Sequence, residues 1–259
     1  MSKLLLLAIL TVSLRAQDTK AIFERVMEAE KTNDEHAARY TYIQDTTYYS
    51  YDKKGIAKKD HTETSEVIFV EGETYKRLVA RDGKPLSPKE QAKEEKKMRQ
   101  TAEERRKARR NSLFNRTVRF GTKDLAELFD SRVLGEEEIR GRKAWIIECN
   151  PQPGRVLKNQ HEKDVLVTQS KIWVDQAEHE IVKWNLSFIA EGSVIKPGSI
   201  AEFEYKKVND DAWLQISGIS DLRLQIAKFI RAQQRSEYRN SNFQKFDVES
   251  TITVDEIKP

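Results

Sequence analysis

The sequence predicts an α+β protein, a long antiparallel sheet accompanied by a few helices. Three observations predict this class. Runs in which apolar and polar residues alternate recur along the chain, as where Ala201, Phe203 and Tyr205 alternate with charged residues. Turn residues separate these runs, and an amphipathic segment precedes the first of them. Because one side of such a run is polar, we expect these strands to have one solvent-exposed face.

The composition allows one domain with a sizeable core. The chain has 259 residues, of which 38% are hydrophobic and 34% are charged, so it is more polar than an average globular protein. Its 46 Lys and Arg residues nearly balance its 42 Asp and Glu residues, and a net charge of +4 gives no strong field for attracting nucleic acid. We find no repeat or low-complexity linker and expect residues 17–259 to form a single domain.

The first 16 residues are typical of a secretory signal peptide. Lys3 precedes the apolar run Leu4–Leu14, and the small residue Ala16 precedes a polar stretch. This run is too short to span a bilayer, which needs about 20 apolar residues. A buried N-terminal helix is the alternative. We expect residues 1–16 to be removed and the mature protein to be periplasmic.

A helix and three strands are expected to follow. Ile22, Phe23 and Val26 form an apolar stripe within Ala21–Ala37, which indicates an amphipathic helix. Strands are expected at Arg39–Tyr51, Glu63–Val70 and Thr74–Arg81, with turns at Asp52–Gly55 and Asp82-Gly83. These strands make an antiparallel meander.

A highly charged helix is expected next, as an insertion at about residues 88–112. Ser87 is placed to cap it and Pro88 to occupy its first position. Lys89–Arg110 contains ten Lys or Arg residues against five Glu. With so few apolar residues, it is expected to lie solvated on the surface. The functional alternatives are a cover over a cavity or a contact for anionic lipid or an acidic partner.

The second half of the chain is expected to be mostly strands. A short helix, Lys123–Val133, comes first, and a hairpin turns at Gly141 between Glu137–Arg140 and Arg142–Cys149. Asn150–Asp164 reads as a loop. Four strands follow at Val165–Asp175, Glu180–Glu191, Ser199–Lys207 and Ala212–Ile219, then a segment that fits strand better than helix at Leu222–Gln234 and a β-rich end at Phe246–Val254.

Motifs for catalysis or metal binding are absent from the sequence. The four histidines (His36, His61, His161 and His179) are scattered without metal-ligand spacing. No nucleophile elbow, phosphate loop or dinucleotide turn occurs. Asp175, Glu178 and Glu180 cluster at a hairpin, where acidic residues commonly occupy the turn. We therefore expect neither an enzyme nor a cofactor or metal.

A single cysteine, Cys149, excludes an internal disulfide. It ends the mostly apolar run Ala144–Cys149, so we expect a buried thiol rather than a reactive one.

The apolar faces of two strands are the candidate binding site. Val182, Trp184, Leu186 and Phe188 alternate with polar residues and point one way from an extended chain. Such a face can meet either a packed core or a cavity. The aromatic bulk favours an acyl-sized cavity, for which the predicted lining residues are Trp184, Leu186, Phe188, Phe203 and Tyr205.

Three segments together carry a resemblance to a known family. They are "GRKAWIIECNPQPG" at Gly141–Gly154, "KIWVDQAEHEIVKWNLSF" at Lys171–Phe188 and "YRNSNFQKFDVES" at Tyr238–Ser250. With the signal peptide and the N-terminal amphipathic helix, they make the chain resemble the outer-membrane lipoprotein-sorting protein family, the LolA/LolB-like fold. The hairpin Lys171–Phe188 is the most telling part, and several branches share it, including periplasmic stress sensors.

The resemblance implies a curved antiparallel sheet, an incomplete β-barrel, with helices packed on its concave face. It further implies a non-catalytic periplasmic carrier or binder of the acyl chains of lipid or lipoprotein, with a possible envelope protein partner and a role in outer membrane biogenesis and transport. The alternative is a ligand-sensing or partner-binding envelope module of the same fold without a transport role. The charged helix is more polar than an apolar lid of this family is expected to be.

Overall fold

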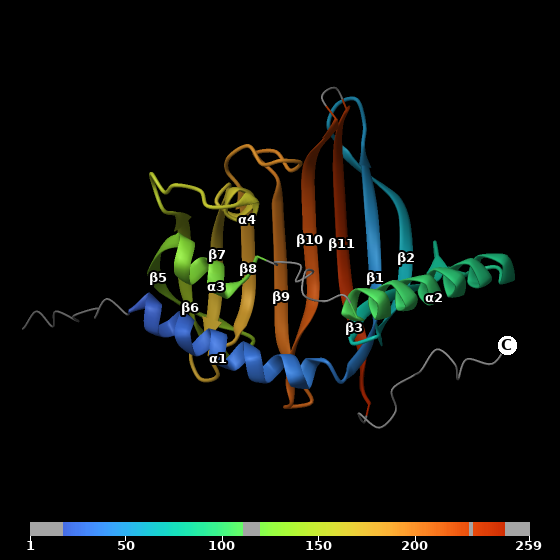
Figure 1. The fold of residues 1–259 in the computed structure, drawn as a ribbon, viewed down its shortest axis with the longest axis horizontal. Helices are drawn as coiled ribbons and strands as arrows, with labels where there is room; N and C mark the ends of the chain where they lie inside the picture. The colour runs from blue at the N-terminus through green and yellow to red at the C-terminus, as the bar shows by residue number, and fades with distance from the viewer. Residues whose placement is uncertain (1–17, 111–119, 228–229, 247–259) are drawn as a thin grey trace, which may run out of the picture.

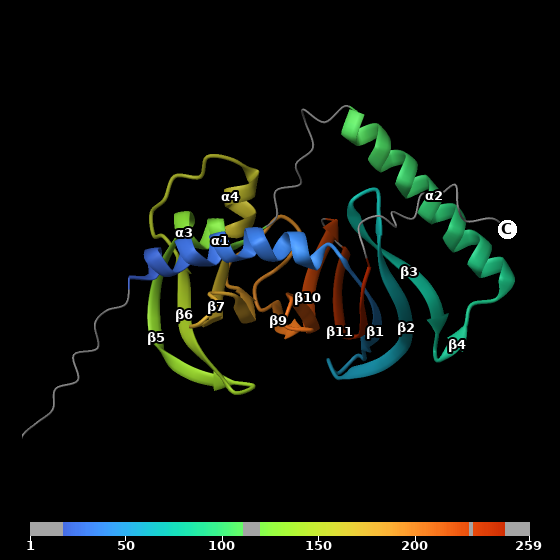
Figure 2. The same cartoon turned by 90° about the horizontal axis from the view of Figure 1, so that it is seen from below.

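A computed structural model describes residues 18–110, 120–227 and 230–246. Its strands form one antiparallel sheet of 11 strands in the order β4-β3-β2-β1-β11-β10-β9-β8-β7-β6-β5. The first long strand therefore pairs with the last, and β4 and β5 are free edges, so the sheet curves without closing (Figures 1 and 2). This confirms the predicted fold class. The predicted signal peptide lies outside the described residues.

The helices are α1 Thr19–Ala37, α2 Pro88–Arg110, α3 Thr122–Leu128 and α4 Gln160–Val165. The strands are β1 Tyr40–Tyr51, β2 Ala57–Val70, β3 Glu73–Arg81, β4 Lys84–Pro85, β5 Phe129–Ile139, β6 Arg142–Pro151, β7 Thr168–Asp175, β8 Ile181–Phe188, β9 Ile200–Val208, β10 Ala212–Ala227 and β11 Ile230–Lys245.

Two-residue turns with left-handed backbone join several of the strands. Asp82 and Gly83 have φ of 50° and 71°, and Arg140 and Gly141 have φ of 52° and 77°. Positive φ at both central residues matches the right-handed twist of the flanking strands, and glycine adopts it without strain. The turns predicted at Asp82-Gly83 and at Gly141 are therefore confirmed.

Helix α1 lies across the concave face of the sheet (Figure 2). Asp18 caps it by accepting a hydrogen bond from the backbone N–H of Lys20 at 3.0 Å. The predicted stripe of Ile22, Phe23 and Val26 is buried. It packs with the buried apolar side chains of α3, α4 and β5–β8 into the main core (Leu125, Leu128, Phe129, Trp145, Ile147, Cys149, Val165, Ile172, Val174 and Ile181).

The strand register shows which side chains point to the side of the sheet on which α1 lies. Residues opposite one another on neighbouring strands point to the same side of a sheet. Buried Ile172 stands opposite Trp184, Trp184 opposite Phe203, Phe203 opposite Gly218 and Gly218 opposite Tyr238. A single concave face thus runs from the covered core to β11.

The charged helix α2 packs on the other face of the sheet. Its Met98 and Ala102 are buried against Val70 and Tyr75, and Tyr75 points away from the concave face. Arg105 donates to three backbone carbonyls of the β2–β3 hairpin at 2.8–3.0 Å. In Figure 2 α2 lies outside β3. Since α2 flanks the sheet from outside, it does not cover the concave face. It is also held to the sheet by more contacts than expected of a solvated surface helix.

Several predicted boundaries are wrong. The helix predicted at Lys123–Val133 ends at Leu128, because residues from Phe129 onward pair with β6 as β5. The loop predicted at Asn150–Asp164 contains α4, which Asn159 caps by accepting from the N–H of Glu162 at 2.9 Å.

At the other end, the strand predicted at Leu222–Gln234 is two strands, because β10 and β11 pair with each other there as a hairpin. Strand β2 begins at Ala57, earlier than predicted. Most of the β-rich end predicted at Phe246–Val254 lies outside the described residues.

Candidate functional site

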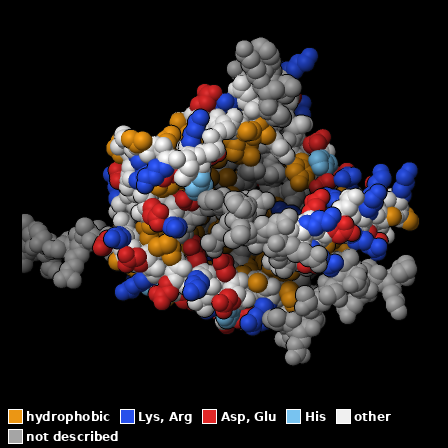
Figure 3. All heavy atoms as spheres, viewed as in Figure 1, with side chains coloured by type: hydrophobic (Ala, Val, Ile, Leu, Met, Phe, Trp, Pro, Cys, Tyr) orange, Lys and Arg blue, Asp and Glu red, His pale blue; other side chains and the backbone are white. Residues whose placement is uncertain are grey.

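The candidate site is the concave face beyond the cover of α1 and α3, over β8, β9, β10 and β11. All five predicted lining residues are half-buried on this face. Trp184 stands opposite Phe203, Leu186 stands opposite Ala201, and Tyr205 and Phe188 follow at period two on the same two strands. Figure 3 looks onto this side of the molecule, where hydrophobic side chains show among charged ones around a hollow.

Trp184 marks the border between the core and the open face. Its indole Nε1 donates to the Ser170 hydroxyl at 3.1 Å, and its ring meets Phe120 edge-on at 5.3 Å between centroids. Val182 was predicted to share its direction but packs in a different cluster, with Trp173 and Trp213. The cause is a register shift between β7 and β8, which leaves Val182 without a partner in the ladder.

Tyr238 of β11 extends the aromatic strip beyond the predicted residues. Its hydroxyl accepts a hydrogen bond from the Gln215 side-chain amide at 2.5 Å. The ring lies over Gly218, where an added Cβ would overlap the Tyr238 hydroxyl. Burial raises the pKa of Tyr238, and burial together with the Glu30 charge raises the pKa of Tyr205 to about 12. Both phenols therefore stay neutral at physiological pH.

Lys76 contributes a cation to this face. Its Nζ lies 5.6 Å from the centroid of the Tyr238 ring, although Lys76 belongs to β3 and Tyr238 to β11. The contact reaches across two intervening strands, β2 and β1, so the sheet curls tightly at this end. Burial lowers the pKa of Lys76. Within the described chain no carboxylate forms an ion pair with it.

Phe188 lines a separate small hollow of about 290 Å³ at the end of β8, with Val167, Val194 and Ile195. Nearby Ile189 and Val194 are large apolar residues that are about half exposed, at 52% and 48%. The structure therefore divides the five predicted residues. Trp184, Phe203 and Tyr205 lie with Tyr238 along one strip, and Leu186 and Phe188 follow along β8 toward the strip's end.

A hollow of about 330 Å³ lies beneath the C-terminal half of α1, next to this strip. Trp184, Tyr205 and Trp213 line it, as do Glu30 and Glu180. The amide of Asn33 fixes α1 above it, accepting from the Trp213 backbone N–H at 2.7 Å and donating to its carbonyl at 2.9 Å.

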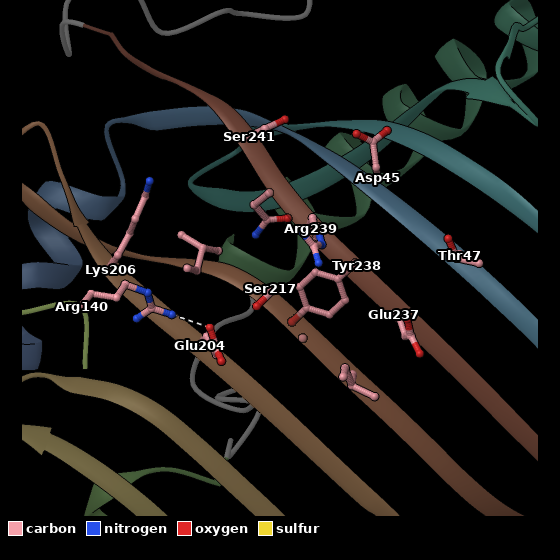
Figure 4. Close-up of a pocket in the computed structure, with 14 residues that line it drawn as sticks. Asp45, Thr47, Arg140, Glu204, Lys206, Ser217, Glu237, Tyr238, Arg239 and Ser241 are labelled. Carbon is pink, nitrogen blue, oxygen red and sulfur yellow. Dashed lines mark hydrogen bonds and ion pairs between the residues drawn. The ribbon is translucent and has the colours of Figure 1, made fainter. Parts of the chain in front are cut away.

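A larger hollow, about 720 Å³, lies on the opposite, polar side of the sheet (Figure 4). Its charged side chains come from outward-facing positions, and Arg140 and Glu204 form an ion pair there. Glu237 accepts hydrogen bonds from Arg235 and Tyr49. Because charged and polar side chains line it, this groove suits an apolar ligand less well than the concave face does.

Groups suited to catalysis do not gather in the described structure. Three histidines contact a carboxylate, including His36 with Asp211 at 2.8 Å and His161 with Asp124 at 2.8 Å. Within the ranges that the structure describes, no group of three or more His, Cys, Asp or Glu is placed to hold a metal ion. Cys149 is fully buried, as predicted, and burial raises its thiol pKa to about 12.

None of the helices in the described parts of the chain is both long and apolar enough to cross a membrane. No protein-family model and no curated protein matches the chain.

Several solved structures are similar to this chain. One is an outer membrane lipoprotein-sorting protein domain from Vibrio parahaemolyticus, with 12% identity, a TM-score of 0.39 and coverage of 89% of this chain and 93% of that one. Another is a LolA superfamily protein from Nitrosomonas europaea, with 8% identity, a TM-score of 0.34 and coverage of 86% and 94%. A third is the MucA/MucB complex of Pseudomonas aeruginosa, with 10% identity, a TM-score of 0.28 and coverage of 89% and 99%. The structures similar to this chain thus include members of the family that its motifs resemble.

Proposed function

We propose that this chain is a non-catalytic, periplasmic protein that binds the acyl chain of a lipid or lipoprotein on its concave sheet face. The observation that carries the proposal is the strip of half-buried aromatic side chains on β8, β9 and β11, which begins beneath α1 and continues beyond it at Phe203 and Tyr238. The strip consists of Trp184, Phe203, Tyr205 and Tyr238.

The energetics of aromatic side chains support this function. Fully burying an aromatic side chain removes roughly 150–250 Å² from water, so covering the part of these four side chains that is still exposed would favour binding. Exposed apolar surface that is contiguous and rimmed by polar groups is typical of binding sites. An acyl chain is flexible and apolar along its length, and it could follow the strip from Trp184 toward Tyr238.

A second candidate function is a ligand-sensing or partner-binding envelope module without a transport role. The charged helix α2 favours it, because this helix adds a basic surface on the outer face of the sheet that acyl-chain binding does not use. An acidic envelope protein would be the matching partner.

The proposal is tested by native mass spectrometry of the protein exported from a bacterial host. We expect a mass shift that corresponds to a bound lipid and disappears on extraction with organic solvent. The matched variants are Phe203→Asp, which places a charge in the strip, and Glu202→Gln, a neighbouring change on the polar face. Loss of the lipid in the first variant alone supports the proposal. A wild-type protein that is folded and lipid-free contradicts it.

A further inference from the structure

The hollow beneath α1 combines aromatic walls with carboxyl groups. Trp184, Tyr205 and Trp213 provide the walls, and Glu30 and Glu180 lie among them. Neither Lys nor Arg nor His lines this hollow in the described chain. In Figure 1 α1 crosses in front of β9 above this part of the sheet.

Among the described residues, Glu180 forms no ion pair, although Lys207 lines a neighbouring hollow with it. Its side chain is only 7% exposed. The described residues offer its carboxyl neither a hydrogen bond nor an ion pair, whereas Glu30 accepts a hydrogen bond from the Thr122 hydroxyl at 2.5 Å. A carboxyl that is mostly buried and has no described partner loses hydration without compensation, and this one lines the hollow, where a bound group could reach it.

The nearby cations are held by other carboxylates. Arg142 binds Asp175 at 2.7 Å and Glu178 at 2.8 Å, and Lys207 binds Glu178 at 2.8 Å. Among the described residues, the charges with the largest effect on Glu180 are acidic, namely Glu30 and Asp34 from α1 and Asp175 and Glu178 from the β7–β8 turn, while Lys207, which lines a neighbouring hollow with Glu180, is bound to Glu178. Burial and the Glu30 charge raise the pKa of Glu180 to about 8, which agrees with a site that lacks its cation.

We propose that this hollow binds an alkylammonium group, the cationic head of an amphiphile whose chain lies along the aromatic strip. Aromatic faces attract organic ammonium ions, and a carboxylate beside them adds the opposite charge. A metal ion fits less well, because within the described residues the carboxylates here do not form a group of three or more placed to hold one. Trp184 and Tyr205 belong both to the hollow and to the strip, so head and chain would be continuous. This inference rests on the proposed function and specifies its ligand.

Three amphiphiles with the same twelve-carbon chain test the inference: dodecyltrimethylammonium, laurate and uncharged monolaurin. Each is titrated below its critical micelle concentration at pH 8.5, and affinity is measured by calorimetry. In the wild type we expect the ammonium form to bind at least about tenfold more tightly than monolaurin, which corresponds to about 1.4 kcal/mol. Glu180→Gln should reduce that advantage to about threefold or less while leaving monolaurin binding unchanged. Glu28→Gln removes the same charge from the exposed side of α1 and should have no effect.

The outcomes separate the inference from the proposed function. If all three head groups bind with equal affinity, acyl binding stands and the inference is overturned. If no amphiphile binds, the proposed function fails. The inference is then tested by adding tetramethylammonium, which has no alkyl chain, and following the NMR chemical shifts of the indole N–H groups. Shifts that vanish in Glu180→Gln support the site. Unchanged spectra overturn it.

Discussion

Two halves of one concave face have different neighbours. Over β6 and β7 the face is buried under α1 and α3, and Ile147 and Ile172 are fully buried there. Over β9 and β11 the same face carries Phe203 and Tyr238, which are half-buried and meet no described helix. The strands alternate apolar and polar residues in both halves. The covering helix, and not the pattern on the strand, decides which half is core.

This difference predicts that equal truncations have unequal effects in the two halves. Phe23 of α1 is 1% exposed in the covered half, and Phe203 is its partly exposed counterpart. We expect Phe23→Ala to lower the free energy of unfolding by about 3–5 kcal/mol and Phe203→Ala by about 1–2 kcal/mol. Urea unfolding followed by circular dichroism measures both. Equal losses of unfolding free energy in the two variants would contradict the distinction between a covered and an open half.

Gly218 tests how closely the open half is packed. A methyl group at this position would overlap the Tyr238 ring, so Gly218→Ala should displace the ring and cost about 1–3 kcal/mol. In a Tyr238→Ala background the same change should be nearly neutral, because the overlapping atoms are gone. A cost that is unchanged in the double variant would place the strain elsewhere.

Cys149 provides a smaller effect in the covered half. Ser131 stands opposite Cys149 on β5, and its buried hydroxyl lies beside the thiol. A hydroxyl at position 149 could bond to it, so Cys149→Ser should cost about 1 kcal/mol or less. Cys149→Ser in a Ser131→Ala background should cost more. The urea midpoints of Cys149→Ser, Ser131→Ala and the double variant measure these costs.

The smallest effect is a pH dependence at the border of the two halves. Glu180 holds its proton in the folded state up to about pH 8, whereas in the unfolded chain it loses the proton near its ordinary value of 4.5. Between these two pH values the folded state binds one proton more than the unfolded chain. The contribution of Glu180 to stability therefore falls as pH rises from about 5 to 8. Glu180→Gln should raise the melting temperature at pH 8 by about 2–4 °C and change it little at pH 5. An equal shift at both pH values contradicts this.

The fold was largely predictable because its signals are local. Alternation located most strands, and turn residues such as Asp82-Gly83 located hairpins, since both act over a few residues. The α3–β5 boundary was missed because Phe129 fits a helical stripe as well as a strand, and pairing with β6 decides it. The hairpin within Leu222–Gln234 was missed because no glycine or proline marks its turn.

The site was predictable only in part, because it depends on pairing between distant segments. Trp184, Phe203 and Tyr205 follow from alternation on β8 and β9, and the structure places them on one face. Tyr238 and Lys76 meet only because β1 pairs with β11 and the sheet curls. Glu180 looked like a turn residue, and only the position of α1 above it reveals that its carboxyl is buried.

Bromine quenching of tryptophan fluorescence tests most directly whether the open half of the concave face binds acyl chains. Trp184 and Trp173 lie on neighbouring strands and point to opposite faces, since Ile172 is the residue opposite Trp184. A bromine-labelled fatty acid should quench the wild-type fluorescence. The account predicts that Trp184→Phe removes most of this quenching and that Trp173→Phe retains it. Absence of quenching in the folded wild type, or full quenching in Trp184→Phe, would contradict it.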